Sequence, residues 1–265
     1  GKRAVILGSG DIGLIMARRM TLEGAEVHAV AEVMPYSGGL KRNIVQCLDD
    51  FDIPLYLSTT VVEIHGQEHL TGVTLAQVDD RRLPVAGTER YIPCDTLLLS
   101  VGLLPENELT CQAGAALDAV TGGPAVDETL ATSLPGVFAC GNVLHVHDLV
   151  DFVSQEAAAA GRSAARYVLE GVKDSESIRL EGKNGVRYTV PQSLHRGGAP
   201  VTVRFRVGQP YRNAARCAYA GSTLLKRIPK RILTPGEMES FPLDPAAIPA
   251  GADTVTFVVE EAQAQ

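Results

Sequence analysis

The residues with the clearest chemistry form a short glycine-rich segment near the start of the sequence. They follow the spacing GxGxxG and are Gly8, Ser9, Gly10, Asp11, Ile12 and Gly13. In such a turn the first Gly allows a tight bend, the second lets a pyrophosphate approach the backbone, and the third lets a helix pack close to the strands. A plain glycine-rich turn of an α/β domain is the alternative, so the neighbouring elements decide between the two interpretations.

Those neighbours predict a strand–helix–strand unit. Residues 4–7 are an apolar run typical of a buried parallel strand, and residues 11–22 carry apolar side chains at helical spacing before the stop signal Gly24. Residues 26–31 form a second apolar strand. The glycine-rich turn therefore opens the helix of a βαβ unit, where the free N–H groups of the helix attract phosphates.

Two carboxylates in this unit bear on the ligand. Glu32 lies 24 residues after Gly8, where a carboxylate accepts hydrogen bonds from both ribose hydroxyls and repels a 2′-phosphate. The sequence therefore predicts NAD as cofactor, with NADH preferred over NADPH. Asp11 is a second anion beside the phosphates and should oppose their binding slightly unless it points away.

Composition bounds the class of protein. The chain has 265 residues, of which 45% are hydrophobic and 21% charged, a globular mix. No run of about 18 apolar residues predicts a membrane span. Five scattered Cys without a CxxC pair exclude a zinc ribbon or dithiol pair within these residues and favour reduced thiols in the cytoplasm. Because the sequence begins Gly1-Lys2-Arg3 and enters a strand at once, we expect a fragment of a longer protein.

Charge is distributed unevenly along the chain. Residues 1–180 carry 13 Lys and Arg against 24 Asp and Glu, a net charge of −11, whereas residues 181–265 carry 11 against 7, a net charge of +4. The acidic part argues against a nucleic-acid partner. The Arg residues of the basic part alternate along predicted strands, which favours a solvated sheet face.

The remaining pattern predicts an α/β protein followed by a small all-β, sandwich-like domain. Residues 40–51 and 149–169 read as helices, and residues 61–64 and 71–78 as an antiparallel pair. Further strands are predicted at residues 94–100, 136–140, 186–190, 201–207 and 254–259. The predicted domains are a Rossmann-like NAD-binding domain at 1–100, a second α/β part at 101–172, a polar linker at 173–185 and the β domain at 186–265.

These motifs together carry a resemblance. Besides the glycine-rich turn and Glu32, the quoted segments are Leu97-Leu-Leu-Ser-Val-Gly-Leu-Leu-Pro-Glu-Asn107 and Thr132-Ser-Leu-Pro-Gly-Val-Phe-Ala-Cys-Gly-Asn142. Over about residues 2–170 the chain resembles the C-terminal two-thirds of the flavin-dependent pyridine nucleotide–disulfide oxidoreductases, in which an NAD(P)H domain interrupts an FAD domain. Within that family it is most similar to the subunits related to opine dehydrogenase and hydrogen cyanide synthase.

The resemblance implies roles for particular residues. Gly102 would border the nicotinamide, Gly141 and Asn142 would lie at the FAD pyrophosphate and ribityl chain, and the 149–169 helix would end near the flavin ring. Residues 101–172 would then be the C-terminal part of an FAD-binding domain. Two positions depart from the family: Asn142 stands where Asp is usual, and Ile15 where the disulfide enzymes usually carry Glu. The family's first GxGxxG for FAD, and its CxxC where present, would precede residue 1.

Two further groups of residues have more than one interpretation. His145 and His147, followed by Asp148, suit a metal site, the lining of a flavin or substrate pocket, or a polar surface loop; we predict no metal. Cys140 is expected to be a small apolar filler in a buried strand rather than a reactive thiol. No acid, base or nucleophile is assigned as catalytic.

The predicted function is therefore an FAD-dependent oxidoreductase that passes hydride from NADH to FAD and on to a small-molecule substrate or a redox partner protein. The alternative is a non-catalytic dinucleotide-binding subunit of a multi-subunit dehydrogenase. The β domain, including a surface His195, is expected to serve homodimer or partner-subunit contact and not catalysis.

Overall fold

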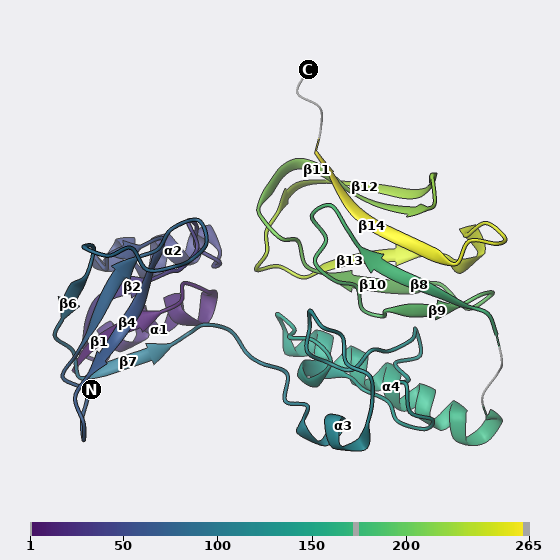
Figure 1. The fold of residues 1–265 in the computed structure, drawn as a ribbon, viewed down its shortest axis with the longest axis horizontal. Helices are drawn as coiled ribbons and strands as arrows, with labels where there is room; N and C mark the ends of the chain where they lie inside the picture. Colours follow the sequence, from purple (N-terminus) through teal and green to yellow (C-terminus); the bar gives the residue numbers. More distant parts are fainter. Residues whose placement is uncertain (1, 172–174, 262–265) are drawn as a thin grey trace. The chain divides into compact units, whose positions relative to one another are not determined.

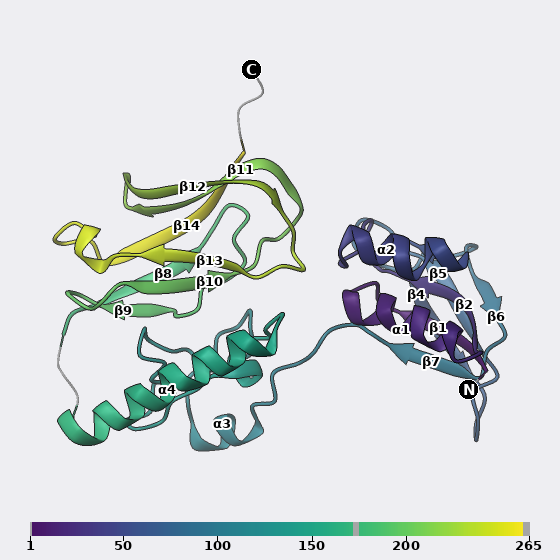
Figure 2. The same cartoon turned by 180° about the vertical axis from the view of Figure 1, so that it is seen from behind.

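The computed structural model describes residues 2–171 and 175–261. The chain folds into two compact units, unit 1 (Gly1–Gly102) and unit 2 (Leu103–Gln265). Figures 1 and 2 show both from opposite sides.

Unit 1 is an α/β body with two sheets. Its elements are β1 (Arg3–Leu7), α1 (Asp11–Leu22), β2 (Glu26–Ala31), α2 (Lys41–Cys47), the 3₁₀ turn η1 (Asp49–Phe51), β3 (Leu55–Tyr56), β4 (Thr59–His65), β5 (Gly72–Gln77), β6 (Arg90–Ile92) and β7 (Thr96–Leu99). One sheet is parallel, with strand order β3-β2-β1-β7. The other is antiparallel, with order β4-β5-β6. The predicted βαβ unit is confirmed with the bounds expected for α1 and β2.

The parallel sheet lies between two apolar layers because successive side chains of a strand point to opposite faces. On β1, Ala4 and Ile6 pack with Leu14 of α1 on the helix side. Val5 faces the other way and packs with Leu75 of β5. Figure 2 shows α1 and α2 side by side over one face of the sheet. All these side chains are at most 2% exposed, so β1 is buried on both faces.

The helix predicted at residues 40–51 is shorter than expected. Regular helix ends at Cys47, and Leu48 leaves helical geometry with φ −116° before the single 3₁₀ turn η1. Asp52 follows with φ 55°, a left-handed conformation that stops a helix. The helix therefore ends several residues before Pro54, the residue from which the sequence predicts its end.

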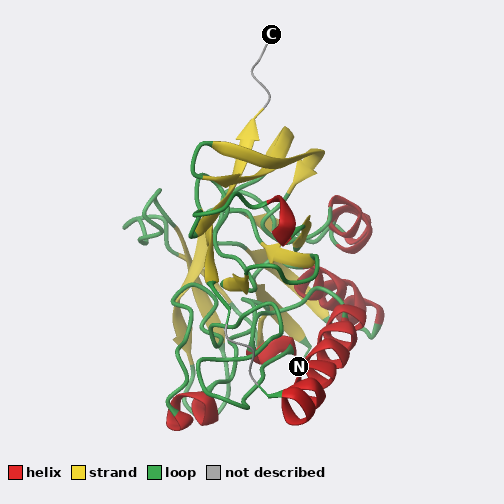
Figure 3. Ribbon diagram, turned by 90° about the vertical axis from the view of Figure 1, so that its right-hand side faces the viewer, coloured by secondary structure: helices red, strands yellow, loops and turns green. Residues whose placement is uncertain are grey.

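Unit 2 contains a long helix, drawn in red in Figure 3, and two further sheets. Its elements are α3 (Glu108–Ala113), the 3₁₀ turn η2 (Gly141–Val143), α4 (Val150–Glu170), β8 (Ser177–Gly182), β9 (Ser193–His195), β10 (Val201–Phe205), β11 (Tyr211–Ala220), β12 (Thr223–Leu233), β13 (Glu239–Leu243), the 3₁₀ turn η3 (Pro245–Ala247) and β14 (Thr254–Glu261). One sheet has the order β12-β11-β14-β8-β9, and β10 pairs with β13 in the other. Within residues 2–171 and 175–261, no helix is long and apolar enough to cross a membrane.

The two sheets of unit 2 enclose one apolar core. Phe205 of β10 and Phe241 of β13 both pack against Phe257 of β14, with ring centroids 6.1 and 5.4 Å from it; the second pair is edge-to-face, and all three rings are fully buried. Aromatic rings supply much apolar area per residue, so this trio joins the sheets. The sandwich-like β region predicted from period-two alternation is confirmed.

The β region shares a second core with the segment before it. Tyr188 and Val190 pack against Val126, Leu144 and Ala160. A reciprocal pair of hydrogen bonds reinforces this contact: the Val126 N–H donates to Oε1 of Gln192 (2.8 Å), and the Gln192 N–H donates to the Val126 carbonyl (3.0 Å). The β region and residues 103–171 are therefore packed together within unit 2.

Three segments differ from the sequence-based expectation. In the stretch 173–185, predicted as a linker, residues 177–182 form β8, while 173 and 174 lie outside the described residues. Residues 136–140 and 186–190 are not strands. They pair only through isolated bridges, such as Ala131 with Phe138 and Val186 with Val207, because too few consecutive residues meet to form a ladder.

Candidate functional site

The three glycines of the turn have different surroundings. At Gly8, φ is +98° and a Cβ would lie 2.1 Å from the Ser100 carbonyl oxygen; at Gly13, a Cβ would lie 2.5 Å from the Gly8 carbonyl oxygen. Both positions therefore need Gly for close packing of the turn, α1 and the end of β7. Nothing lies within 4 Å of a Cβ at Gly10, so this side of the turn is open.

The open turn leads directly into α1. Gly10 is the residue before the helix, and no side chain caps the first turn. The N–H groups of that turn, together with the positive end of the helix dipole, are thus left for an anion. The backbone at Gly10 can approach a pyrophosphate closely, because no side chain stands between them.

Glu32 is held at the carboxyl end of β2 by three hydrogen bonds. Its Oε2 accepts from the Ser9 N–H (2.9 Å) and the Ser9 hydroxyl (2.7 Å), and its Oε1 accepts from the Met34 N–H (2.9 Å). Glu32 is only 9% exposed. A carboxylate has about four acceptor positions, so it can still receive a hydroxyl of a ribose.

Asp11 faces the start of α2. Its Oδ1 accepts from the Leu40 N–H (2.8 Å) and from Nδ2 of Asn43 (2.7 Å). These donors offset the charge and hold the carboxylate. The opposition to phosphate that the sequence suggested is thereby reduced.

Ile15 and Gly102, which the resemblance places near the nicotinamide, are both accessible. Ile15 is 46% exposed on α1. Gly102 has φ +95°, and no atom lies within 4 Å of a Cβ there. Ile15 therefore offers an apolar surface where a Glu side chain would offer hydrogen bonds.

The second motif, Gly141–Asn142, forms the turn η2. Gly141 is buried, with φ +73°, whereas Asn142 is exposed. The His147 N–H donates to Oδ1 of Asn142 (3.1 Å). Since a backbone N–H can only donate, the atom facing it must be the amide oxygen, and the amide NH₂ is left for a ligand.

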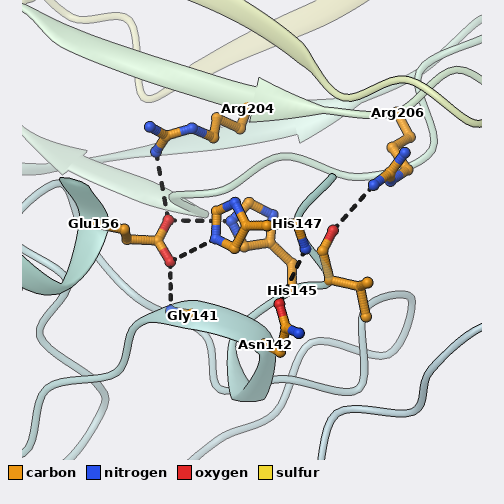
Figure 4. A network of polar contacts seen from close by, with 8 residues as sticks. Gly141, Asn142, His145, His147, Glu156, Arg204 and Arg206 are labelled. Carbon is orange, nitrogen blue, oxygen red and sulfur yellow. Dashed lines mark hydrogen bonds and ion pairs between the residues drawn. The ribbon is translucent and has the colours of Figure 1, made fainter. Parts of the chain in front are cut away.

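A buried network adjoins this turn (Figure 4). The carboxylate of Glu156 on α4 accepts from the Gly141 N–H (2.7 Å), and it lies 3.1 Å from Nε2 of His145 and 2.9 Å from Nε2 of His147. Nη1 of Arg204 reaches the same carboxylate at 3.4 Å. Glu156 and both His residues are at most 9% exposed, so the network is closed to solvent.

Protonation in this network follows from burial and hydrogen bonding. Burial opposes the charge of Glu156, but the hydrogen bonds from His145, His147 and Gly141 outweigh it and lower its pKa to about 2. For His145 burial is the larger effect and lowers its pKa, although Glu156 acts in the opposite direction. Glu156 is therefore ionised and accepts only, and His145 is neutral with its proton on Nε2. The Nδ1 atoms of His145 and His147 are buried and have no hydrogen-bond partner among the described residues.

A second ion pair lies beside the network. The Arg206 guanidinium donates to the Val146 carbonyl (3.0 Å) and to the Asp148 carboxylate, which also accepts from the Met238 N–H (2.7 Å). Arg206 follows β10 directly. The C-terminal β region thus contacts residues 146–148 through a charged side chain.

Several sequence-based interpretations are corrected here. His145 and His147 are buried, which excludes the polar surface loop. Arg204 and Arg206 are not on a solvated sheet face, since their side chains are only 18% and 15% exposed and meet carboxylates. Cys140 is half-buried outside any strand; burial raises the pKa of its thiol, which disfavours reactivity.

The donors around Glu156 favour a hydrogen-bond network over a metal site. His145, His147 and Glu156 are close enough to share an ion, as are Asp127, Glu128 and His195. In the first group, however, four donors occupy the carboxylate and one of them is the Arg204 cation, which would repel a metal. In the second group the residues are partly exposed, and His195 lies 3.2 Å from Glu128.

Sequence reasoning missed Glu156, Arg204 and Arg206. Glu156 directly precedes the four alanines 157–160 of α4, and a carboxylate beside this apolar run is the signal that could have found it. No local signal joins it to Arg204, which is 48 residues away.

Comparison with known proteins identifies relatives for the first part of the chain. The family described as "Pyridine nucleotide-disulphide oxidoreductase" matches residues 1–164. The glutamate synthase (NADPH) small chain of Escherichia coli is 27% identical over 188 residues, covering 64% of this chain and 38% of that protein. The NADP(+)-dependent formate dehydrogenase subunit beta of Moorella thermoacetica is 31% identical over 185 residues, covering 64% and 26%.

A solved structure gives the same result. The thioredoxin reductase of T. acidophilum has a TM-score of 0.55 and 30% sequence identity, and the match covers 64% of this chain and 54% of that one. The chain spans 26% to 54% of the length of these three relatives. The finer resemblance to opine dehydrogenase and hydrogen cyanide synthase subunits stays a prediction.

Proposed function

Because this chain belongs to the pyridine nucleotide-disulphide oxidoreductase family, we propose that it binds NADH in unit 1 and contributes to an FAD site in unit 2, so that hydride passes from NADH to the flavin. Membership of the family supports both cofactors. The main observation in support of NADH binding is the open backbone at Gly10, which lies next to a helix N-terminus and to the carboxylate of Glu32.

The proposed NADH site assigns a task to each residue. The turn at Gly10 and the first-turn amides of α1 would hold the pyrophosphate. Glu32 would accept from the adenosine ribose and repel a 2′-phosphate. Two relatives carry NADPH or NADP(+) in their names; the charge and burial of Glu32 support the opposite preference in this chain.

The residues of unit 2 fit a flavin at the Gly141–Asn142 turn. The amide NH₂ of Asn142, an exposed residue, would donate to a ribityl hydroxyl. Bound FAD would supply the hydride-accepting ring. Ile15 would exclude water from the nicotinamide edge instead of hydrogen-bonding to it.

The sequence has a single GxGxxG, so we propose that the adenine-binding half of the FAD site lies outside these 265 residues. The electrons would then pass to a small-molecule substrate or a redox partner protein. The alternative is a non-catalytic dinucleotide-binding subunit. Ile15 and Asn142 favour it, since each replaces a residue that the resemblance leads one to expect, and two relatives are named as a chain or subunit of larger enzymes.

Absorbance tests the proposal. A protein that also contains the residues proposed to bind the adenine half of FAD should be yellow, and its flavin absorbance should disappear when NADH is added in the absence of oxygen. Colourless protein that only binds NADH weakly would support the subunit alternative. The 265-residue chain alone should lack a full flavin band; about one flavin per chain there would show that the FAD site is complete without further residues.

A further inference from the structure

The carboxylate of Glu156 is the point where three segments of unit 2 meet. It accepts from Gly141 and both His residues of the 141–147 segment, itself stands on α4, and receives Arg204 from β10 (Figure 4). Four donors for two oxygens satisfy a carboxylate fully. Removing any one of them leaves buried negative charge less compensated.

We propose that Glu156 and Arg204 are positioning residues of the flavin site: Glu156 fixes the Gly141–Asn142 turn, and Arg204 supplies from β10 the positive charge that balances this buried carboxylate. The inference rests on the proposed function, because it takes that turn to be the flavin contact. If Arg204 has this role, the C-terminal β region contributes a residue to the proposed flavin site.

Glu156 reaches the turn by two routes. It holds the Gly141 N–H directly, at 2.7 Å. It also holds the ring of His147, and the backbone N–H of His147 donates to Oδ1 of Asn142. Asn142 therefore presents its NH₂ as a donor to a ribityl hydroxyl, whereas an Asp would accept. Loosening Glu156 would free both residues of the turn at once.

Arg204 sets the charge of the network. The groups that face His145 are Glu156 from α4, His147 from its own segment, Arg204 from β10 and Tyr188, whose ring centroid is 6.3 Å away. The Arg204 charge contributes to the lowered pKa of His145. Without Arg204 the network would carry an uncompensated negative charge and would take up a proton on an imidazole more readily.

The experiment compares three variants in the flavin-loaded protein with its adenine-binding half present. Arg204→Met removes the charge, Arg204→Lys keeps it, and Arg212→Met removes an exposed Arg of β11 as the matched control. We expect Arg204→Met to raise the FAD dissociation constant about tenfold, in keeping with the loss of one charged hydrogen bond. Its flavin midpoint potential should fall at high pH, and the difference from the wild type should narrow as the pH is lowered, because His145 takes up a proton more readily without the Arg204 charge. Arg204→Lys should restore most of both properties, and Arg212→Met should match the wild type.

A second measurement needs no flavin. In the 265-residue chain, NMR should show His145 titrating at higher pH in Arg204→Met than in the wild type. If Arg204→Met does not fold, Glu156→Gln replaces it, with the same loss of FAD affinity expected. Wild-type-like affinity, potential and His145 titration in these variants would overturn the inference and leave the proposed function standing. Absence of FAD from the wild type itself would instead overturn the proposed function, and the inference with it.

Discussion

Ser9 donates both its backbone N–H and its hydroxyl to one oxygen of Glu32, at 2.9 and 2.7 Å. The second residue of the glycine-rich turn is thus tied to the residue that ends β2. This pair fixes the distance between the glycine-rich turn, which is proposed to bind the pyrophosphate, and the Glu32 carboxylate, which is proposed to bind the ribose hydroxyls. The two parts of the proposed nucleotide site are therefore held together by this pair of residues as well as by the sheet.

Ser9→Ala should weaken NADH binding about threefold to tenfold, because a side-chain hydrogen bond contributes about 0.5–1.5 kcal/mol. Fluorescence titration of NADH measures this. Ser37→Ala is the control: it removes a hydroxyl that contacts the Ser9 carbonyl but not Glu32. If both variants bind NADH equally well, the Ser9–Glu32 pair does not set the affinity.

Glu32→Arg should narrow or reverse a preference for NADH over NADPH. The Coulomb penalty between a carboxylate and a 2′-phosphate is on the order of 1–4 kcal/mol at partly exposed separations. Dissociation constants for both cofactors check this, with Glu26→Arg at the exposed start of β2 as control. Equal affinities of the parent chain for NADH and NADPH would contradict the role given to Glu32.

Gly10→Ala and Gly13→Ala should separate binding from stability. A Cβ at Gly10 meets open space, so stability should stay within about 0.5 kcal/mol while NADH affinity falls at least about tenfold. A Cβ at Gly13 would meet the Gly8 carbonyl oxygen at 2.5 Å, and overpacking should cost about 1–3 kcal/mol. Thermal unfolding and NADH titration measure the two effects. A Gly10→Ala chain that binds NADH normally would show that no phosphate approaches there.

Acid should destabilise unit 2 in two stages. The pKa of His145 is lowered from 6.5 in the folded state, so the unfolded chain binds more protons and stability falls as pH drops below 6.5. Glu156 has a folded pKa of about 2 against 4.5, so its contribution is present above pH 4.5 and is lost as pH falls from 4.5 toward 2. Lowering the pKa from 4.5 to about 2 corresponds to a contribution of about 3 kcal/mol.

Urea unfolding at a series of pH values measures both stages. Glu156→Gln should be less stable than the wild type at pH 7 and should lack the steep loss below pH 4.5. Asp151→Asn, at an exposed residue in the first turn of the same helix, serves as the comparison for a change outside the buried network. A wild-type slope in Glu156→Gln would mean that another carboxylate dominates the acid limb.

The glycine-rich turn was predictable from the sequence because its residues are contiguous and because a side chain at any of its three Gly positions would block the turn, the ligand or the packing of the helix. The helix α1 and strand β2 followed from periodicity. The network around Glu156 was not predictable in the same way. A period-two pattern shows that Arg204 and Arg206 share one face of a strand, but not that α4 and the 141–148 segment cover that face. The contacts of Arg204 and Arg206 with carboxylates depend on packing between segments about 50 residues apart in the sequence.

Truncation after Gly171 should abolish cooperative unfolding of residues 103–171. Tyr188 and Val190 would be removed from the core that they share with Leu144 and Ala160, leaving that apolar surface exposed. Circular dichroism during thermal unfolding measures the loss. A sharp transition in the truncated unit would show that the β region is a separable module, as its expected role in subunit contact requires.

The shared core of unit 2 also orders events during synthesis. A ribosome makes residues 126–160 before Tyr188 and Val190, and Arg204 emerges later still. Until then the Glu156 carboxylate lacks its cation and Leu144 lacks part of its cover. Domains usually fold as complete units as the chain emerges, so the turn at Gly141 should reach its final form only after β10 is made. A flavin would then be captured only after β10 has left the ribosome, and a chain stopped before β10 would remain a target for chaperones.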